Sequence, residues 1–359
     1  MRILIDIGHP AHVHLFKHFA WEMQRKGHDI LFTCREKEFE IYLLEHYGFQ
    51  YKSFGKKYSS RIGKLWGLIE FDIKEFILGL KFKPDLFLSH GSIYAAHAAW
   101  LLGKPHISLE DTGNWEQIRL YLPFTDVVLT PDVLPHDYGY KHIRYAGYHE
   151  LAYLHPNWFN CNGNVTDHLF VGKTEPYAVL RFVSWRATHD KGLSGFSDEN
   201  KIKAVKEFSK YARVFISSEK ELPEELEPYR IKTPPERMHD VLAHAKLFFG
   251  ESATMASESA VLGTPAIYLN EHWLGYTNEE QEYGLLFSYK VSPEDQIAAI
   301  EKGFSLLQQP GLEEDMKQNR SRFLSEKIDP TAFMVWFIEN YPESFNVLKE
   351  NPDYQYNFK

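Results

Sequence analysis

The stretch MRILIDIGHPAHVHLFKHFAWEMQRKGHDILFTC, residues 1–34, predicts the fold. Its apolar start, RILIDIG, is typical of a buried parallel strand, and Leu15, Phe16, Phe19 and Met23 then recur at helical spacing. A second apolar run, HDILFTC, follows Gly27. The order strand, loop, helix, glycine, strand opens a Rossmann-like βαβ unit. Its first loop, GHPAHVH, therefore lies at the carboxyl edge of a parallel sheet, where ligands bind.

The same alternation continues and then restarts. Further strands are expected at FQYKSFG, DLFLSHG, PHISLED and DVVLTPD, before a turn-rich segment, HPNWFNCNGNVTD at 155–167, that resembles a linker. After it, strands are expected at YAVLRFV, ARVFISS, KLFFGES and PAIYLN. We therefore predict an α/β protein of two Rossmann-like parallel-sheet domains, 1–160 and 161–330, that face each other across a cleft. The aromatic helix and tail at 331–359 are expected to pack back on the first domain.

Composition excludes several classes of protein. The 49 acidic and 40 basic residues give a formal charge of -9, which argues against a general binder of nucleic-acid backbones. The two cysteines, Cys34 and Cys161, are far apart, so they signal neither a disulfide framework nor a thiolate zinc site. No signal peptide is recognised at the start and no run of 18 apolar residues occurs. A cytoplasmic protein with no transmembrane segment is expected.

The segment GESATMASESAVLGTPAIYLN, residues 250–270, is the best candidate for a phosphate site. Ser252, Ala253 and Thr254 stand between a strand and a helix, where free N–H groups and the positive end of the helix dipole favour an anion. Glu258, one helical turn further on, is placed to accept hydrogen bonds from a ribose diol. The alternative is an ordinary helix capped by Ser252 or Thr254, with Glu258 on a solvated face.

This segment resembles the donor-site motif of GT-B-type glycosyltransferases and of non-hydrolysing UDP-N-acetylglucosamine 2-epimerases. DIGHPAHVHLFKHF, RFVSWRATHDKG and PPERMHDVLAHAKLFFGES are more narrowly similar to an uncharacterised bacterial and archaeal family, a domain of unknown function placed near those enzymes. The resemblance implies a GT-B-like fold that binds a nucleotide-diphosphate sugar as substrate, with no cofactor. It implies that Glu258 binds the ribose and that PPERMHD, by its position, reads the base.

A cationic loop follows the first strand of the second domain. LRFVSWRATHDKG, residues 180–192, carries Arg181 and Arg186, which can clamp a diphosphate through paired hydrogen bonds. With Ser184 and His189, they are our further candidates for the donor's phosphate or sugar. The alternative is a salt-bridged surface loop in which Arg186 pairs with Asp190.

Three histidines crowd the first loop. His9, His12 and His14 come from one short segment without an HExxH pattern or a nearby cysteine, so no metal site is predicted. His14 is expected to begin the helix, leaving His9 and His12 over the sheet edge. In several inverting GT-B enzymes a histidine of this loop deprotonates the acceptor, which implies His12 as the general base and His9 as the second choice. The alternative is that these histidines only hold the loop.

Other strand ends complete the predicted pocket. A histidine base is usually oriented by a carboxylate, and Glu110 and Asp111 end a neighbouring strand; Asp111 is our choice. His90 and Gly91, at the end of a third strand, are expected to line the pocket with Gly8 and His14.

The predicted function is metal-independent transfer of a sugar from a nucleotide-diphosphate sugar to a glycan or lipid-linked acceptor in surface-polysaccharide synthesis. Two alternatives stay open: a UDP-sugar 2-epimerase and a nucleotide-sugar-binding protein without catalysis. The first is disfavoured because this chain has GESAT where the epimerase family carries a DSGG-like loop.

The helix expected at RIGKLWGLIEFDIKEFILGL, residues 61–80, bears on membrane contact. Its apolar residues recur at helical intervals, and its polar face balances lysines against acids, whereas membrane-surface helices are rich in cations. Core packing is favoured, and peripheral contact with a membrane through a lipid-linked acceptor is the alternative.

Overall fold

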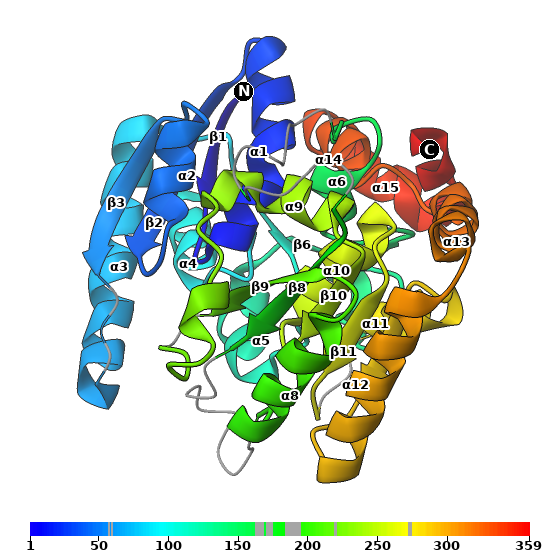
Figure 1. Ribbon diagram of the computed structural model, residues 1–359. Coiled ribbons are helices and arrows are strands. Elements are labelled where there is room, and N and C mark those ends of the chain that lie inside the picture. Colours follow the sequence, from blue (N-terminus) through cyan, green and yellow to red (C-terminus); the bar gives the residue numbers. More distant parts are fainter. Residues whose placement is uncertain are drawn as a thin grey trace. The chain divides into compact units, whose positions relative to one another are not determined.

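The computed structural model of the protein describes residues 1–56, 58, 60–161, 169, 175–183, 195–218, 221–271 and 275–359. The chain divides into two compact units (Figure 1). Unit 1 consists of Met1–Trp158 and Lys327–Lys359, and unit 2 is Phe159–Glu326.

Unit 1 is built on a seven-stranded sheet in the order β3-β2-β1-β4-β5-β6-β7, in which every neighbouring pair is parallel. Its strands are β1 (Arg2–Asp6), β2 (Asp29–Glu36), β3 (Tyr51–Lys56), β4 (Leu86–His90), β5 (His106–Leu109), β6 (Val127–Pro131) and β7 (His142–Tyr145). Its α-helices are α1 (Pro10–Arg25), α2 (Glu40–His46), α3 (Arg61–Phe82), α4 (Ile93–Leu102), α5 (Trp115–Tyr121), α6 (Leu151–Leu154), α14 (Pro330–Glu339) and α15 (Glu343–Glu350). The order 3-2-1-4-5 is that of a Rossmann fold, as predicted.

Unit 2 has a five-stranded parallel sheet in the order β12-β11-β10-β8-β9. Its strands are β8 (Tyr177–Phe182), β9 (Arg213–Ser218), β10 (Leu247–Gly250), β11 (Ala266–Leu269) and β12 (Leu286–Tyr289). The described part of this unit contains the α-helices α8 (Asp198–Phe208), α9 (Met238–His244), α10 (Ala253–Leu262), α11 (Gly275–Glu282), α12 (Pro293–Gln308) and α13 (Leu312–Glu326). Both sheets are thus doubly wound α/β layers, which confirms the predicted fold class. Strands β7 and β12 were not predicted.

Helix α1 begins earlier than the sequence suggested. Pro10 occupies its first turn, where the absent N–H of proline costs nothing, and the His9 side chain caps it by accepting a hydrogen bond from the Ala11 N–H at 3.1 Å. The expectation that His14 begins the helix is wrong. His12 therefore lies on the first turn of α1 and not in the preceding loop.

A buried ionic network ties the carboxyl ends of β1 and β2 to α3 and α4. Asp6 accepts hydrogen bonds from Arg35, from Ser92 and, at 2.7 Å, from Thr33. Ser92 also caps α4, since its hydroxyl accepts from the Ala95 N–H at 3.2 Å. Glu75 of α3 joins the network through Thr33, and burial together with the charge of Asp6 raises its pKa. The network holds the loops after β1 and β4 in register.

Helix α3 leaves most of its predicted core row exposed. Phe76 packs against a core cluster, as expected, whereas the prediction of core packing is wrong for Leu65, Trp66, Ile69, Ile73 and Ile77. The helix lies so close to its neighbours that a Cβ on Gly79 would come within 2.5 Å of Leu102 and 3.2 Å of Phe87. On its inner side Phe71, Glu75 and Gly79 are buried. Phe76, Leu78 and Phe82 also pack against the core cluster that contains Leu4 and Phe87. A second set of large apolar residues lies on the outside, where Ile69 and Ile73 are half exposed. Among the described residues, no helix is both long and apolar enough to cross a membrane.

The C-terminal segment completes unit 1. Helix α14 packs against α1 and α6 and buries Phe333, Phe337 and Ile338. Asp329 caps this helix by accepting hydrogen bonds from the Thr331 and Ala332 N–H groups at 2.9 and 3.0 Å.

Candidate functional site

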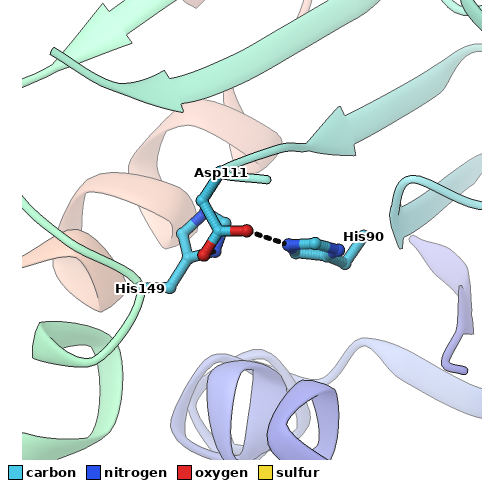
Figure 2. Close-up of side chains that lie close together, drawn as sticks. All are labelled: His90, Asp111 and His149. Atoms are coloured by element: carbon cyan, nitrogen blue, oxygen red, sulfur yellow. Dashed lines mark hydrogen bonds and ion pairs between the residues drawn. The ribbon is translucent and has the colours of Figure 1, made fainter. Parts of the chain in front are cut away.

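Four polar side chains from separate strand ends meet at the carboxyl edge of the unit 1 sheet. His12 follows β1, His90 ends β4, Asp111 follows β5 and His149 follows β7. Strands β1, β4 and β5 are neighbours in the sheet, so their carboxyl ends lie together. Figure 2 shows His90 and His149 converging on the carboxylate of Asp111. We call these four residues the histidine cluster.

Asp111 is the centre of the histidine cluster. His90 Nε2 lies 2.9 Å from one of its carboxylate oxygens and His149 Nδ1 lies 3.0 Å from the other. All three side chains are less than one fifth exposed, with values of 10%, 18% and 7% for His90, Asp111 and His149. Burial by itself would raise the pKa of Asp111, but the two imidazoles outweigh it and hold that pKa well below its usual range. Asp111 is therefore a carboxylate that accepts from both rings.

His90 and His12 are neighbours with opposite tendencies. Burial opposes the charged form of His90, yet the carboxylate of Asp111 prevails and raises its pKa. The ring of His12 lies on that of His90, with centroids 4.3 Å apart and planes at 30°. Burial, followed by the nearby charge of His90, lowers the pKa of His12 well below its usual value. Of the two neighbouring rings, His90 therefore favours the protonated form and His12 the neutral form.

The tautomer of His12 follows from one contact. Its Nδ1 accepts a hydrogen bond from the Gly8 N–H at 3.2 Å, so in the neutral ring the proton resides on Nε2. In this arrangement His12 presents a donor, whereas the role expected from the sequence, a general base, requires a free lone pair. The contact favours a hydrogen bond from His12 to a substrate oxygen.

His149 has the complementary tautomer. Its Nδ1 donates to Asp111, which leaves Nε2 with the lone pair in the neutral ring. Nε2 is buried and has no hydrogen-bond partner among the described residues. The ring is stacked on Tyr145, with centroids 6.4 Å apart. Asp111 thus orients the His149 ring, and Nε2 can accept a proton. This is the arrangement of a histidine that acts as a general base.

The same residues form a donor set that suits a metal ion. His90, Asp111 and His149 each offer a ligand atom, and these atoms lie within 4.8 Å of one another. Two imidazoles and a carboxylate can hold zinc or another divalent transition metal. A bound ion would replace the two hydrogen bonds to Asp111.

The remaining predicted residues of unit 1 surround the cluster or support it. His9 caps α1, and its Nε2 lies 3.6 Å from a carboxylate oxygen of Glu38. His14 is buried between the rings of Tyr47 and Tyr153. Within the described part of the chain, the histidines that contact Asp111 are His90 and His149, not His9 or His14.

The strand ends around Gly91 are held by local contacts. Gly91 adopts a left-handed φ of 58°, and its N–H donates to the Ser108 hydroxyl at 3.0 Å. Glu110, the alternative to Asp111, accepts from the N–H groups of Thr112 and Gly113 and from the Tyr121 hydroxyl. Glu110 therefore shapes the loop that carries Asp111.

In unit 2 the segment predicted to bind phosphate runs from β10 into α10, and Ser252 caps the helix, as the alternative interpretation expected. Helix α10 is capped by Ser252, whose hydroxyl accepts from the Met255 N–H at 3.3 Å, and Gly263 ends it with a φ of 89°. Ser252, Ala253 and Thr254 at its first turn are partly exposed. Gly250 before them passes close to the Arg181 backbone, where a Cβ would lie 2.4 Å from the carbonyl oxygen. The chain therefore needs a glycine at position 250, because β10 passes too close to the β8 backbone there for a side chain to fit.

Buried polar groups stand behind this loop. Glu258 lies 3.0 Å from His239 Nε2, and both side chains are buried, which rules out the solvated face considered for Glu258. His239 belongs to the PPERMHD segment, so the structure links the two segments that the resemblance assigned to the nucleoside. Arg181 donates to the Ser217 hydroxyl at 2.8 Å. The predicted residues Ser184, Arg186 and His189 lie outside the described part of the chain.

Two informative residues escaped the sequence analysis. His149 follows β7, a four-residue strand, HIRY, whose polar residues hid it from an apolar-pattern search. Glu251 is buried and accepts hydrogen bonds from the Val183 and Phe196 N–H groups at 3.1 and 2.7 Å. A search for a histidine after every strand, weak strands included, would have found His149.

Comparison with known proteins supports this description of the fold. An uncharacterised protein of Methanocaldococcus jannaschii is 24% identical over 276 residues, which are 74% of this chain and 80% of that protein. The crystal structure of UDP-GlcNAc 2-epimerase from Neisseria meningitidis bound to UDP-GlcNAc superposes with a TM-score of 0.67 at 13% identity, covering 95% of this chain and 100% of that one. The spinosyn rhamnosyltransferase SpnG, complexed with spinosyn aglycone, gives a TM-score of 0.59 at 13% identity, with 95% and 100% covered.

These similarities to solved structures establish a GT-B-type fold. The family described as "Protein of unknown function (DUF354)" matches residues 1–275, which is most of the chain, so the protein belongs to that family.

Proposed function

We propose that this protein transfers a sugar from a nucleotide-diphosphate sugar to a hydroxyl of a glycan or lipid-linked acceptor. In this proposal unit 2 binds the donor and the histidine cluster of unit 1 removes the acceptor's proton. The observation that carries it is the 3.0 Å contact between Asp111 and His149 Nδ1, which leaves a buried Nε2 without a hydrogen-bond partner among the described residues. The choice of a nucleotide-sugar donor is supported by the GT-B-type fold and by the UDP-GlcNAc bound to one of the similar structures.

The chemistry assigns one task to each group. His149 Nε2 takes the proton of the acceptor hydroxyl while that oxygen forms a bond to the anomeric carbon of the sugar. The bond from that carbon to the diphosphate oxygen breaks, and the nucleoside diphosphate leaves with the electron pair. Asp111 stabilises the imidazolium that forms on His149. His12 donates from Nε2 to a substrate oxygen.

The leaving diphosphate needs positive charge. The first turn of α10, with Ser252, Ala253 and Thr254, offers N–H groups and the positive end of a helix dipole. Arg181 lies on β8, the strand paired with β10, and adds a cation beside this turn. Glu258 and His239 are assigned to the nucleoside.

Nucleotide release tests the proposal. UDP- and GDP-sugars are incubated with protein and with glycan or lipid extracts, in EDTA, and the free nucleoside diphosphate is measured. His149→Ala should slow release by about two to four orders of magnitude without changing nucleotide affinity, the usual effect of removing a general base. His46→Ala, at an exposed histidine of α2, is the matched control and should retain full activity.

Three results would contradict parts of the proposal. Full activity of His149→Ala combined with loss in His12→Ala would return the base to His12, as the sequence suggested. Loss of activity in EDTA, restored by Zn²⁺, would mean that the cluster holds a metal. Binding of UDP or GDP with no release on any extract would favour a nucleotide-sugar-binding protein.

A second candidate is epimerisation of a UDP-sugar. The observation that favours it is the proximity of His90, whose pKa is raised, to His149, since a proton donor and a proton acceptor both contact Asp111. In this reaction the C2 proton is removed and later returned to the other face. UDP-GlcNAc incubated in D2O without acceptor would then gain deuterium at C2, whereas a transferase leaves C2 unlabelled.

A further inference from the structure

Helix α3 carries a row of large apolar side chains on its outer side. From Trp66 on, the residues of this outer stripe lie three or four positions apart, and Leu65 precedes them, so they share one helix face over about 22 Å at 1.5 Å per residue. Their exposed fractions are 66% for Leu65, 61% for Trp66, 50% for Ile69, 52% for Ile73, 44% for Ile77 and 51% for Leu80. Six such residues on one helix exceed the scattered single apolar residues of an ordinary surface.

The acids of α3 are engaged with other groups. Glu70 accepts from Lys74 at 2.5 Å and from the Tyr58 hydroxyl at 2.6 Å. Asp72 pairs with His97 at 2.9 Å. Glu75 is fully buried in the network around Asp6. The acids that balanced the lysines of α3, and so argued against a membrane-surface helix, are therefore paired with other side chains or buried. None of them belongs to the outer stripe.

Cations outnumber acids in the stretch of sequence that contains the stripe. Residues 56–83 contain seven lysines and arginines against three acids, a local balance of plus four in a chain whose formal charge is -9. Lys56 lies shortly before α3, Lys81 in its last turn and Lys83 directly after it, and all three are exposed. An anionic surface attracts each such cation by roughly 1 kcal/mol.

We propose that the outer stripe of α3 docks unit 1 on an anionic lipid bilayer, with the helix lying in the interface plane. An apolar face on a helix that exposed lysines flank along the chain fits that partner, because the apolar side chains can enter the acyl boundary while the lysines meet the headgroups. A second copy fits less well, since a symmetric contact would bring the same cations against one another. The proposal does not depend on the reaction.

Vesicle flotation tests it with the full-length protein. Vesicles of phosphatidylcholine, alone or with about one third phosphatidylglycerol, are mixed with wild-type protein and with three variants. The first variant, Ile73→Glu with Ile77→Glu, should reduce binding to the anionic vesicles by roughly tenfold or more. The second, Lys81→Glu with Lys83→Glu, should weaken that binding in low salt and have less effect in high salt. Ile297→Glu, at a 40% exposed isoleucine of α12, is the control and should bind like the wild type.

Each outcome has one meaning. Circular dichroism melting must show all variants folded, and nucleotide affinity of the unit 2 loop, measured by calorimetry, should be equal in all of them. Binding that is selective for anionic vesicles and lost with the two isoleucines supports the proposal. Equal vesicle binding by wild type and the isoleucine variant overturns it. A dimer in light scattering that the isoleucine variant abolishes, without vesicle binding by the wild type, would also overturn it and make the stripe a protein interface.

Discussion

Replacing Asp111 by asparagine probes the histidine cluster without changing its shape. The carboxylate accepts from His90 at 2.9 Å and from His149 at 3.0 Å. Asparagine has one acceptor oxygen and one donor NH2 group. It can therefore accept a hydrogen bond from one imidazole N–H, while its NH2 group faces the N–H of the other ring and cannot accept from it. One charge-assisted hydrogen bond, worth about 1.5–3 kcal/mol, is lost and the second becomes neutral, which gives a loss of roughly 2–4 kcal/mol in the free energy of unfolding.

The pH dependence of that loss follows from the two pKa shifts. The depressed pKa of Asp111 contributes stability above its unfolded value of about 3.9, and this contribution disappears as pH falls through the folded pKa. The raised pKa of His90 contributes stability below about 6.5, which is lost as pH rises through the folded pKa. Wild type and Asp111→Asn should therefore differ most between about pH 4 and 6.5.

Two measurements check this prediction. Urea unfolding across pH gives the stability difference, and NMR of the imidazoles should show the pKa of His90 falling in Asp111→Asn, because burial, its largest influence, is then opposed only by Glu110 and a backbone hydrogen bond. Asp72→Asn is the matched control: it breaks another aspartate–histidine pair, to His97 at 2.9 Å, whose partners are about one quarter exposed. It should cost less than about 1 kcal/mol and leave His90 unchanged. An unaltered His90 titration in Asp111→Asn would refute the reasoning.

Three further predictions concern other parts of the chain. Burial lowers the pKa of His106 to about 3, so its stabilising effect is present above about pH 6.5 and lost as pH falls; His106→Asn should reduce the decline in unfolding free energy between pH 7 and 5 by about 2 kcal/mol in urea titrations. Glu258→Ala should weaken UDP or GDP binding by about 1.5–3 kcal/mol in calorimetry, and equal affinities would remove the residue from the site. Gly250→Ala should lower the urea midpoint by an amount equivalent to about 1–3 kcal/mol, since the new Cβ would meet the Arg181 carbonyl oxygen at 2.4 Å; an unchanged midpoint would mean that β8 moves aside easily.

The fold was predictable wherever strands are buried on both faces. Runs such as RILID in β1 and DILFTCRE in β2 are rich in apolar residues because parallel sheets are covered by helices on both sides. Strand β7, HIRY, lies at the sheet edge, so half of its side chains are polar and its pattern is weak. For α3, periodicity correctly indicated a helix with one apolar face. It could not say which side of the helix faces the core, since the inner contact combines phenylalanines with a glycine and a buried glutamate and is no more apolar than the outer row.

The candidate site was predictable in its location and less so in its contacts. Residues at strand ends, His90 and Asp111 among them, were named because parallel strands bring their carboxyl ends together. Which ring Asp111 contacts depends on side-chain directions that no spacing reveals. His12 was expected beside Asp111, whereas the recorded hydrogen bonds of Asp111 join it to His90 and His149. The roles of these residues stay predictions.

The return of Lys327–Lys359 to unit 1 sets an order for the synthesis of this protein. When residue 158 leaves the ribosome, the first sheet has all its strands but α1 and α6 still lack the cover of α14. The whole of unit 2 is translated before Phe333, Phe337 and Ile338 can cover that apolar surface. Because domains fold as they emerge from the ribosome, unit 2 can complete its fold before unit 1 does. Until then, the nascent unit 1 exposes the apolar surface of α1 and α6. Packing of Lys327–Lys359 on α1 and α6 thus ends the interval in which the nascent chain is prone to aggregation.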